Sequence, residues 1–337
     1  MLLHVFALLT AAATAVLIFA GGLVTSTGSG LSVPDWPNSY GWFMFTFPIE
    51  NWVGGIFYEH SHRLIASTVG FLILVLAFWL WRAEPRSWVR KLGFIALGAV
   101  ITQGLLGGIT VLWYLPDPVS IAHASLAQIV FGLTTTIALV TSPGWRRGYG
   151  PRGRDLSAVA SAKADDRRLQ RVALFTLAVV YLQIVVGATM RHTDAGLAIP
   201  DFPWMFGHLV PDHWDPKIAI HFAHRVGALC VTAMLLATTG RVFSHHRNRL
   251  ELLRPSLLLL ALVTVQITLG ALTVLSRREY VINSLHVVTG ASVLATTLIL
   301  TLRAHRARFG DAPAGSVAGA RLTADTGHSG AAAGARA

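Results

Sequence analysis

Four histidines stand at repeat-related positions within long apolar stretches of the sequence: His62, His123, His224 and His286. Imidazole is the side chain that most often binds transition metals in proteins. Titratable groups inside membrane-length apolar segments cost free energy, and those that occur there usually serve a function. A lone histidine in such a segment is more often a hydrogen-bonded packing residue, but four at repeated positions indicate metal ligands.

The elements that must position these histidines are eight apolar segments of membrane-spanning length. The chain has 337 residues, of which 53% are hydrophobic and 13% charged, about half the charged share of an average soluble domain. A helix needs about 20 apolar residues to cross the hydrocarbon core. We therefore predict an all-α, polytopic membrane protein. The predicted transmembrane helices cover residues 2–24, 60–81, 92–113, 120–141, 171–190, 217–240, 255–275 and 282–302.

Positive charge gathers in one alternate set of the segments that connect these helices. The net charge is +11, and 21 of the 27 Lys and Arg residues lie in 82–91, 142–171, 241–254 and the tail from 303. Because cationic loops stay in the cytoplasm, we predict a multi-pass cell-membrane protein with both termini inside and the histidines toward the outer face. The basic charge therefore reports topology and does not indicate nucleic-acid binding.

The second half of the chain repeats the first half. Residues 30–37 match 196–203 at an offset of 166, and residues 103–112 match 266–275 at an offset of 163. Nearly the same offset relates the first two histidines to the last two. We therefore predict two repeat-related four-helix bundles in the same orientation. The predicted parts are an N-terminal bundle (1–141), a cytoplasmic linker (142–170), a C-terminal bundle (171–308) and a disordered cytoplasmic tail (309–337).

Within each bundle the two histidines should face each other at equal depth, roughly 5 Å below the outer ends of their helices. Such a pair can hold a flat macrocycle in a bundle interior. Haem fits better than zinc or copper, because the second half offers no carboxylate or thiolate beside its histidines. We therefore predict the four histidines to be axial ligands of two haem irons. The single cysteine, Cys230, excludes internal disulfides and C-x-x-C-H attachment, and we interpret it as a small buried hydrophobe.

The two halves differ at one titratable position beside the histidines. Glu59 stands three residues before His62 and on the same helix face, whereas the residue three positions before His224 is His221. We predict that Glu59 is catalytic, although an acid in the first turn of a helix is also favoured by the helix dipole. The asymmetry predicts one catalytic half and one electron-handling half.

Two arginines and two loops complete the candidate sites. Arg63 and Arg225 each follow one of the histidines. They either pair with haem propionates, a use suited to guanidinium, or extend to the outer interface; the sequence leaves both roles open. The Gly- and Pro-rich loops 25–37 and 191–203 are predicted to cap the two pockets.

Across essentially all eight helices the chain resembles the haem A synthases of bacteria and mitochondria. The resemblance implies oxidation of the C8 methyl of haem O to the formyl group of haem A, for terminal oxidase assembly. It also implies that His62 and His123 flank the substrate haem, with Glu59 catalytic, and that the other two histidines ligate a resident haem b. Some bacterial members carry pairs of external cysteines, so this chain resembles the cysteine-free branch. The motifs that carry the resemblance are Thr27-Gly28-Ser29-Gly30-Leu31, Pro34-Asp35-Trp36-Pro37, Glu59 with His62-Arg63, His123, Gly187, Arg191-His192-Thr193, His224-Arg225 and His286.

Two other functions would also use four membrane histidines. One is a di-haem b electron-transfer protein, such as a quinol- or ascorbate-linked reductase, which does not account for the Glu59 asymmetry. The other is a non-enzymatic haem carrier. For the synthase, the implied partners are haem O, the lipid membrane and an electron donor that the sequence does not identify. A complex with the haem O synthase follows from pathway logic alone, and the sequence leaves a homo-oligomer open.

Overall fold

Eight long helices dominate the computed structural model, which describes residues 1–147 and 156–306. Each of the eight is long and apolar enough to cross a membrane. No strand occurs among the described residues, which confirms the predicted all-α, eight-helix membrane architecture. The short elements are η1 (Met44–Thr46), η2 (Ile49–Asn51) and α5 (Pro143–Arg147). The long helices are α1 (Leu2–Ser26), α2 (Gly55–Ala83), α3 (Ser87–Leu112), α4 (Asp117–Thr141), α6 (Leu156–His192), α7 (Pro216–His245), α8 (Leu250–Leu275) and α9 (Tyr280–Ala304).

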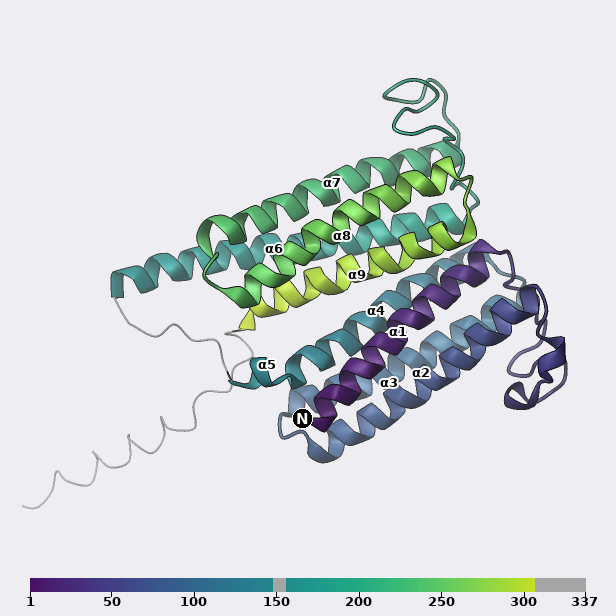
Figure 1. Cartoon of the computed structure of the whole chain (residues 1–337), viewed down its shortest axis with the longest axis horizontal. Helices are drawn as coiled ribbons and strands as arrows, with labels where there is room; N and C mark the ends of the chain where they lie inside the picture. The colour runs from purple at the N-terminus through teal and green to yellow at the C-terminus, as the bar shows by residue number, and fades with distance from the viewer. Residues whose placement is uncertain (148–155, 307–337) are drawn as a thin grey trace, which may run out of the picture. The chain divides into compact units, whose positions relative to one another are not determined.

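The long helices pack as two groups of four (Figure 1). In the first group α2 and α4 each contact both α1 and α3, and in the second group α7 and α9 each contact both α6 and α8. Each group is therefore a closed ring of four helices, as the sequence repeat requires. The groups meet where α9 contacts α1 and α4, and where α4 contacts α6.

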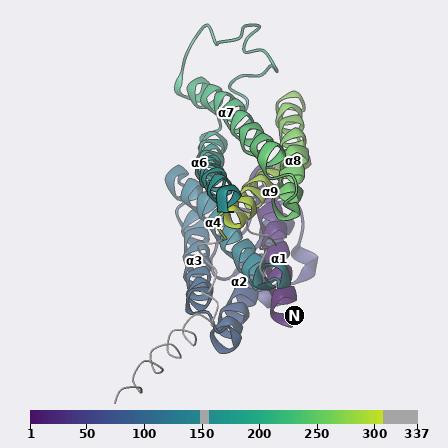
Figure 2. The same cartoon turned by 90° about the vertical axis from the view of Figure 1, so that its left-hand side faces the viewer.

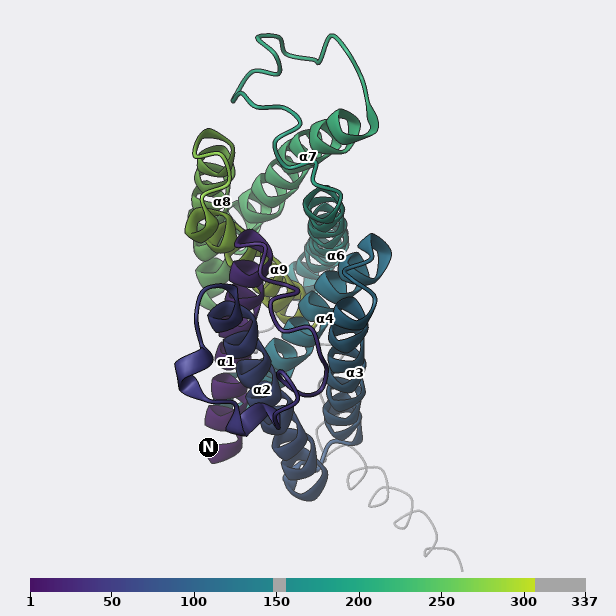
Figure 3. The same ribbon diagram turned by 90° about the vertical axis from the view of Figure 1, so that its right-hand side faces the viewer.

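The two ends of the helices are built differently. Residues 27–54 join α1 to α2, and residues 193–215 join α6 to α7, at what we call the long-loop end (Figure 3). Short turns at residues 84–86 and 246–249 join helices at the opposite, short-turn end (Figure 2). At the long-loop end Asp215 caps α7, because its side chain accepts hydrogen bonds from the backbone N–H groups of Lys217 and Ile218 at 2.7 and 2.8 Å.

Several helices begin earlier than the apolar pattern predicted. α2 begins at Gly55 and not at residue 60, and α4 begins at Asp117 and not at residue 120. At the helical rise per residue, His62 and His123 therefore lie about 10 and 9 Å inside their helices, so the predicted depth of 5 Å is wrong. The prediction failed because polar residues close to the start of each helix, such as Glu59 to Arg63 in α2 and Asp117 in α4, interrupt the apolar run without interrupting the helix.

Two further expectations need correction. α6 begins at Leu156, so it includes the second half of the segment that polar composition indicated as a linker. Alanine and charged residues, which fill this stretch, are good helix formers. Cys230 is exposed on α7 and is not a buried hydrophobe; on a membrane helix a thiol of low polarity tolerates a lipid-facing position. The predicted tail, 309–337, lies outside the described residues.

Glu84 closes the short-turn end of the first group. Its fully buried carboxylate accepts hydrogen bonds from Arg86 at 2.7 Å and from Arg146 at 2.7 Å. Arg86 also donates to the carbonyl of Val140 at the end of α4, at 3.0 Å. Burial alone would raise the pKa of Glu84, but the hydrogen bonds and charges of the two arginines hold it below its ordinary value of 4.5. The turn between α2 and α3 is thereby tied to α4 and α5.

Glu84→Gln should lower the free energy of unfolding by about 2–3 kcal/mol at neutral pH. This is less than the loss for a fully buried ion pair, because Arg146 is 47% exposed. A carboxylate whose pKa is lower in the folded than in the unfolded state stabilises the fold at pH values above its unfolded-state pKa. This stabilisation is lost as the pH falls through the folded-state pKa. The difference in Tm between wild type and variant should therefore shrink below about pH 4.5.

The measurement is thermal unfolding of the purified protein in detergent over a series of pH values. Glu50→Gln is the matched control, because Glu50 is an exposed carboxylate. Equal Tm values for wild type and Glu84→Gln at neutral pH would show that this network does not stabilise the fold.

Candidate functional site

Each of the four predicted ligand histidines packs against a glycine on a neighbouring helix of its own group. The Cε1 atom of each ring lies so close to this glycine that a Cβ atom there would collide or nearly collide with it. Only glycine leaves room for the ring at this separation of the helix backbones. The structure thus places all four histidines in one repeated arrangement. The pairs, with the distance from Cε1 to the position of a Cβ, are Gly21 with His62 (3.1 Å), Gly107 with His123 (3.0 Å), Gly187 with His224 (2.9 Å) and Gly270 with His286 (3.0 Å).

Glutamines fix three of these four histidines. Gln103 donates to the carbonyl of His123 at 3.0 Å, and Gln183 donates to the carbonyl of His224 at 2.7 Å. Gln183 also lies 3.0 Å from Nδ1 of the His224 ring, and Gln266 lies 3.4 Å from Nε2 of His286. Sequence analysis missed Gln183, because its repeat counterpart in the first half is an apolar residue.

His62 is the exception to this pattern. The repeat offset of 166 aligns Gln183 with Leu17, which cannot donate a hydrogen bond. Within the described residues, Nδ1 of His62 is buried without a hydrogen-bond partner, as is Nδ1 of His123 and of His286. Buried polar atoms without partners are rare in native proteins, and they are typical of sites that another group completes.

The second pair of imidazoles is spaced for one metal ion. The ring centroids of His224 and His286 lie 6.5 Å apart, with an angle of 70° between the ring planes. Imidazole nitrogen binds a metal at about 2 Å and lies about 1 Å from the ring centroid, so two axial rings need a centroid separation of roughly 6 Å. The first pair, His62 and His123, also lies within mutual electrostatic range.

The donor set favours a macrocycle over a metal held by protein alone. Residues 1–147 and 156–306 contain no group of three or more His, Cys, Asp and Glu side chains that could hold a metal ion. A protein-bound zinc ion has three or four protein ligands, whereas haem iron takes four nitrogens from the porphyrin and needs only axial ligands. The histidine pairs therefore fit haem.

Arg63 and Glu59 hold the first long loop in place. Arg63 donates to the carbonyls of Val33, Asp35 and Asn38 at 2.6, 2.6 and 3.0 Å. It also forms an ion pair with Glu59 at 2.6 Å. The other carboxylate oxygen of Glu59 accepts the backbone N–H of Val33 at 2.7 Å. Glu59 is only 3% exposed, so both of its oxygens are engaged by the loop or by the arginine that anchors it.

The second long loop is anchored in the same way. Arg225 donates to the carbonyls of Ile199, Asp201 and Trp204 at 3.1, 2.7 and 2.9 Å, which are the counterparts of the first loop's acceptors at an offset of 166. His221 stands where Glu59 stands, and its Nδ1 lies 3.1 Å from the carbonyl of Ala195 and 3.3 Å from the backbone nitrogen of Ile199. Both arginines thus have a loop-anchoring role that sequence analysis missed, and propionate binding by them stays a prediction.

The first loop also contacts the helix that backs His123. A Cβ atom on Gly108 would lie 2.6 Å from the indole of Trp36, so the loop tryptophan sits directly on α3. The preceding residue, Gly107, is the one that contacts the His123 ring. Trp36 therefore covers α3 beside the first histidine pocket.

His60 lies outside the pocket, although it is only two residues from His62. Its ring is fully buried, lies 3.0 Å from the hydroxyl of Ser39 and packs edge-on against Trp52, with 4.6 Å between ring centroids. This position on a different helix face makes His60 part of the packing of the loop.

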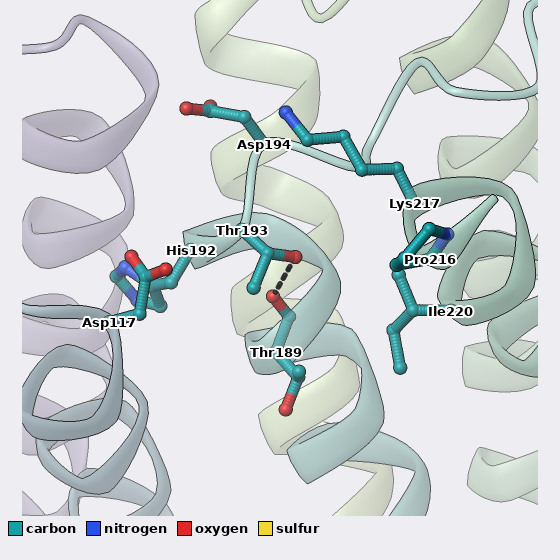
Figure 4. Close-up of a pocket in the computed structure, with 8 residues that line it drawn as sticks. All are labelled: Asp117, Thr189, His192, Thr193, Asp194, Pro216, Lys217 and Ile220. Carbon is teal, nitrogen blue, oxygen red and sulfur yellow. Dashed lines mark hydrogen bonds between the residues drawn. The ribbon is translucent and has the colours of Figure 1, made fainter.

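A cleft of about 560 Å³, lined by residues of α4, α6, α7 and the loop after α6, opens at the long-loop end (Figure 4). His192, at the end of α6, lies within electrostatic range of Asp117 and of His123. The cleft is therefore next to the first histidine pocket. The lining residues are Asp117, Thr189, His192, Thr193, Asp194, Pro216, Lys217 and Ile220.

The fold and these pockets define a class of protein. The chain is a multi-pass helical membrane protein with four histidines in repeat-related positions, of which His224 and His286 are spaced for one metal ion.

Comparison with known proteins agrees with this class. Residues 4–298 match the family model described as cytochrome oxidase assembly protein. The chain is 31% identical to the haem A synthase of Halalkalibacterium halodurans, over 88% of this chain and 94% of that protein. It is 28% identical to the haem A synthase of Geobacillus kaustophilus, over 94% and 98% of the two chains, and 30% identical to that of Symbiobacterium thermophilum, over 86% and 93%. The chain belongs to this family of haem A synthases, as the sequence motifs indicated.

Gly187→Ala should impair haem binding in the second pocket. The added methyl would lie 2.9 Å from Cε1 of His224, so the ring must shift by several tenths of an ångström. The haem content of the purified protein, measured from the absorption of its pyridine complex, should fall. Gly240→Ala is the control on α7, because a Cβ there meets no atom within 4 Å. A wild-type haem content in both variants would contradict the importance of the His–Gly contact.

Proposed function

We propose that this chain is a haem A synthase, a membrane enzyme that oxidises the C8 methyl of haem O to a formyl group for terminal oxidase assembly. Its relatives that carry this name align with nearly the whole chain. The observation that carries the proposal is the pair of duplicated bis-imidazole pockets, of which only the first has a carboxylate, Glu59, at its loop anchor. A duplicated electron-transfer protein has no need for this difference.

The proposed organisation follows the repeat. Residues 1–141 bind substrate haem O between His62 and His123, and residues 171–308 bind a resident haem b between His224 and His286. Residues 142–170, which include the first part of α6, link the two bundles on the cytoplasmic side, where both termini and the tail 309–337 also lie. The chain resides in the cell membrane with its haem sites toward the outer face. The concentration of Lys and Arg in one set of connecting segments supports this orientation.

The reaction sets the tasks of the protein residues. Conversion of a methyl to a formyl group removes four electrons and four protons and adds one oxygen atom at the oxidation level of water, so an oxidant from outside this chain must accept the four electrons. The path leads through an alcohol and a geminal diol, which loses water to give the aldehyde. His62 and His123 hold the substrate porphyrin so that its C8 methyl is presented to the catalytic group, which is an effect of orientation.

Glu59 is the proposed catalytic carboxylate. It accepts a proton that leaves the methyl carbon, or stabilises positive charge that develops there, which is the work of a positioned base. Arg63 holds one carboxylate oxygen by a charge-assisted hydrogen bond, so the group is fixed before the substrate enters. Haem b, when bound, supplies one-electron transfer chemistry, and a separate redox partner exchanges electrons with it.

The proposal is tested by the fate of haem O. The chain is co-expressed with a haem O source, and the porphyrins are extracted and separated by reversed-phase chromatography. A synthase gives haem A or its hydroxylated intermediate. Unchanged haem O from well-folded, haem-loaded protein would instead identify a di-haem b electron-transfer protein or a haem carrier.

Glu59→His is the sharpest variant for the catalytic assignment, because the second half already uses a histidine at this position. His221 contacts the backbone of its loop at Ala195 and Ile199 without a carboxylate, so Glu59→His should preserve the loop and the bound haem. Loss of a catalytic base should lower haem A formation by about 10²–10⁴-fold. The exposed Glu50→Gln should retain activity. If Glu59→His forms haem A at the wild-type rate, Glu59 serves only to anchor the loop.

A further inference from the structure

The long-loop end of the second helix group carries two arginines that the first group lacks. The repeat offsets of 166 and 163 align Arg191 with Thr25, and Arg278 with Leu115. The alignment of the second pair is also structural. Leu115 and Arg278 both have left-handed backbone conformations, with φ of 59° and 68°. The side chain of Leu115 packs beside Gly30, and that of Arg278 beside the counterpart glycine, Gly196. The halves therefore share a backbone and differ in charge.

Arg191 is a cation without an anion. It donates to the carbonyl of Gly22 and to the hydroxyl of Ser26 on α1, both at 2.7 Å. Its Nε is buried without a hydrogen-bond partner, and no ion pair involves Arg191 in the part of the chain that the structure describes. Two neutral acceptors do not compensate a buried guanidinium, so an uncompensated positive charge is expected to attract an anion.

Arg278 adds to this positive field. It lies within electrostatic range of Arg191. Its ion pair with Asp194, at 3.6 Å, is loose, because the side chain of Asp194 is 76% exposed and its charge is screened by water. Two guanidinium groups in a partly buried site repel each other. An anionic group that lies between or beside them offsets this repulsion and accepts charge-assisted hydrogen bonds from both.

Arg191 lies near one histidine of the second pair, and Arg278 lies near Arg191. Arg191 is within electrostatic range of His286, one of the two imidazoles that fit a haem iron. Arg225 is less available to an anion, because it donates to three carbonyls of its own loop at 2.7–3.1 Å. A haem held between His224 and His286 would thus have Arg191 near one of its ligands, with Arg278 beside it, as cations available to its carboxylates.

We propose that Arg191 and Arg278 bind the propionate carboxylates of the haem held by His224 and His286. This inference rests on the proposed function, which makes that haem resident. A planar guanidinium pairs with a carboxylate through two parallel hydrogen bonds. Thr25 and Leu115 give the first pocket no such pairing. The second pocket thus retains its haem, whereas the first holds a porphyrin that must enter as substrate and leave as product.

Haem retention tests the proposal without reference to turnover. The full-length protein, co-expressed with a haem O source, is purified in detergent and mixed with excess apomyoglobin, which captures released haem. Chromatography of the porphyrins that remain on the protein separates haem b from haem O and haem A. Arg191→Gln and Arg278→Leu should each release haem b about tenfold faster than wild type, or more, because each loses a charge-assisted pair. The release of haem O and haem A should not change.

Matched controls separate carboxylate binding from helix packing. Arg277→Gln removes an exposed cation from the same left-handed turn and should leave haem b release unchanged. Ser26→Ala removes one protein partner of Arg191 and should have little effect. Arg278→Leu introduces leucine, the residue that the first half has at the equivalent turn position. The Arg278→Leu variant should therefore fold even if the Arg191→Gln variant does not.

The inference would be overturned if both Arg278→Leu and Arg191→Gln released haem b at the wild-type rate. It would also be overturned if Ser26→Ala fully reproduced the effect of Arg191→Gln. A third contradicting result is wild-type protein that carries no bound haem b. Failure of the proposed function would look different. It would give protein that retains haem b in an Arg191- and Arg278-dependent way but leaves haem O unconverted.

Discussion

The contact between an imidazole ring and a glycine on the next helix determines the geometry of both pockets. A histidine inside a membrane helix needs a polar or metal partner, and its ring needs space between two tightly packed helices. Glycine supplies this space, because a Cβ atom at each of the four positions would lie only 2.9–3.1 Å from Cε1 of the ring. The contact occurs four times in a duplicated fold, and the ring centroids of His224 and His286 lie 6.5 Å apart, which suits a single metal ion between the two rings.

The specialisation of the two halves lies in side chains on a nearly common backbone. Both long loops are anchored by an arginine that follows a histidine, through carbonyls at equivalent positions. The second half has the glutamine that holds His224 and the two arginines at its long-loop end, which would favour a resident haem under the proposed function. At the counterpart positions the first half has two apolar residues, Leu17 and Leu115, and one neutral hydroxyl, Thr25. It also has a carboxylate, Glu59, at its loop anchor. The substitutions that distinguish the halves are Leu17 with Gln183, Thr25 with Arg191, Glu59 with His221, and Leu115 with Arg278.

The helices and the histidines could be predicted from sequence because both depend on local or repeated signals. Apolar runs of membrane length mark each helix, and the constant repeat offset links His62 to His224 and His123 to His286. The depth of the histidines within their helices was predicted poorly, because the polar residues before His62 belong to α2 although they break the apolar run. The anchoring role of Arg63 could not be predicted, since its acceptors are backbone carbonyls, which every residue has. The glycine contacts were equally hidden, because glycine is common in membrane helices and only packing shows which one faces a ring.

The central claim is that each half binds its own haem between its own two histidines. The most direct measurement is the porphyrin composition of purified His286→Ala and His123→Ala variants, each co-expressed with a haem O source. We predict that His286→Ala loses haem b while haem O stays bound, and that His123→Ala retains haem b while binding of haem O is lost. Equal loss of both porphyrins from either variant, with the fold intact by thermal unfolding, would contradict two independent pockets.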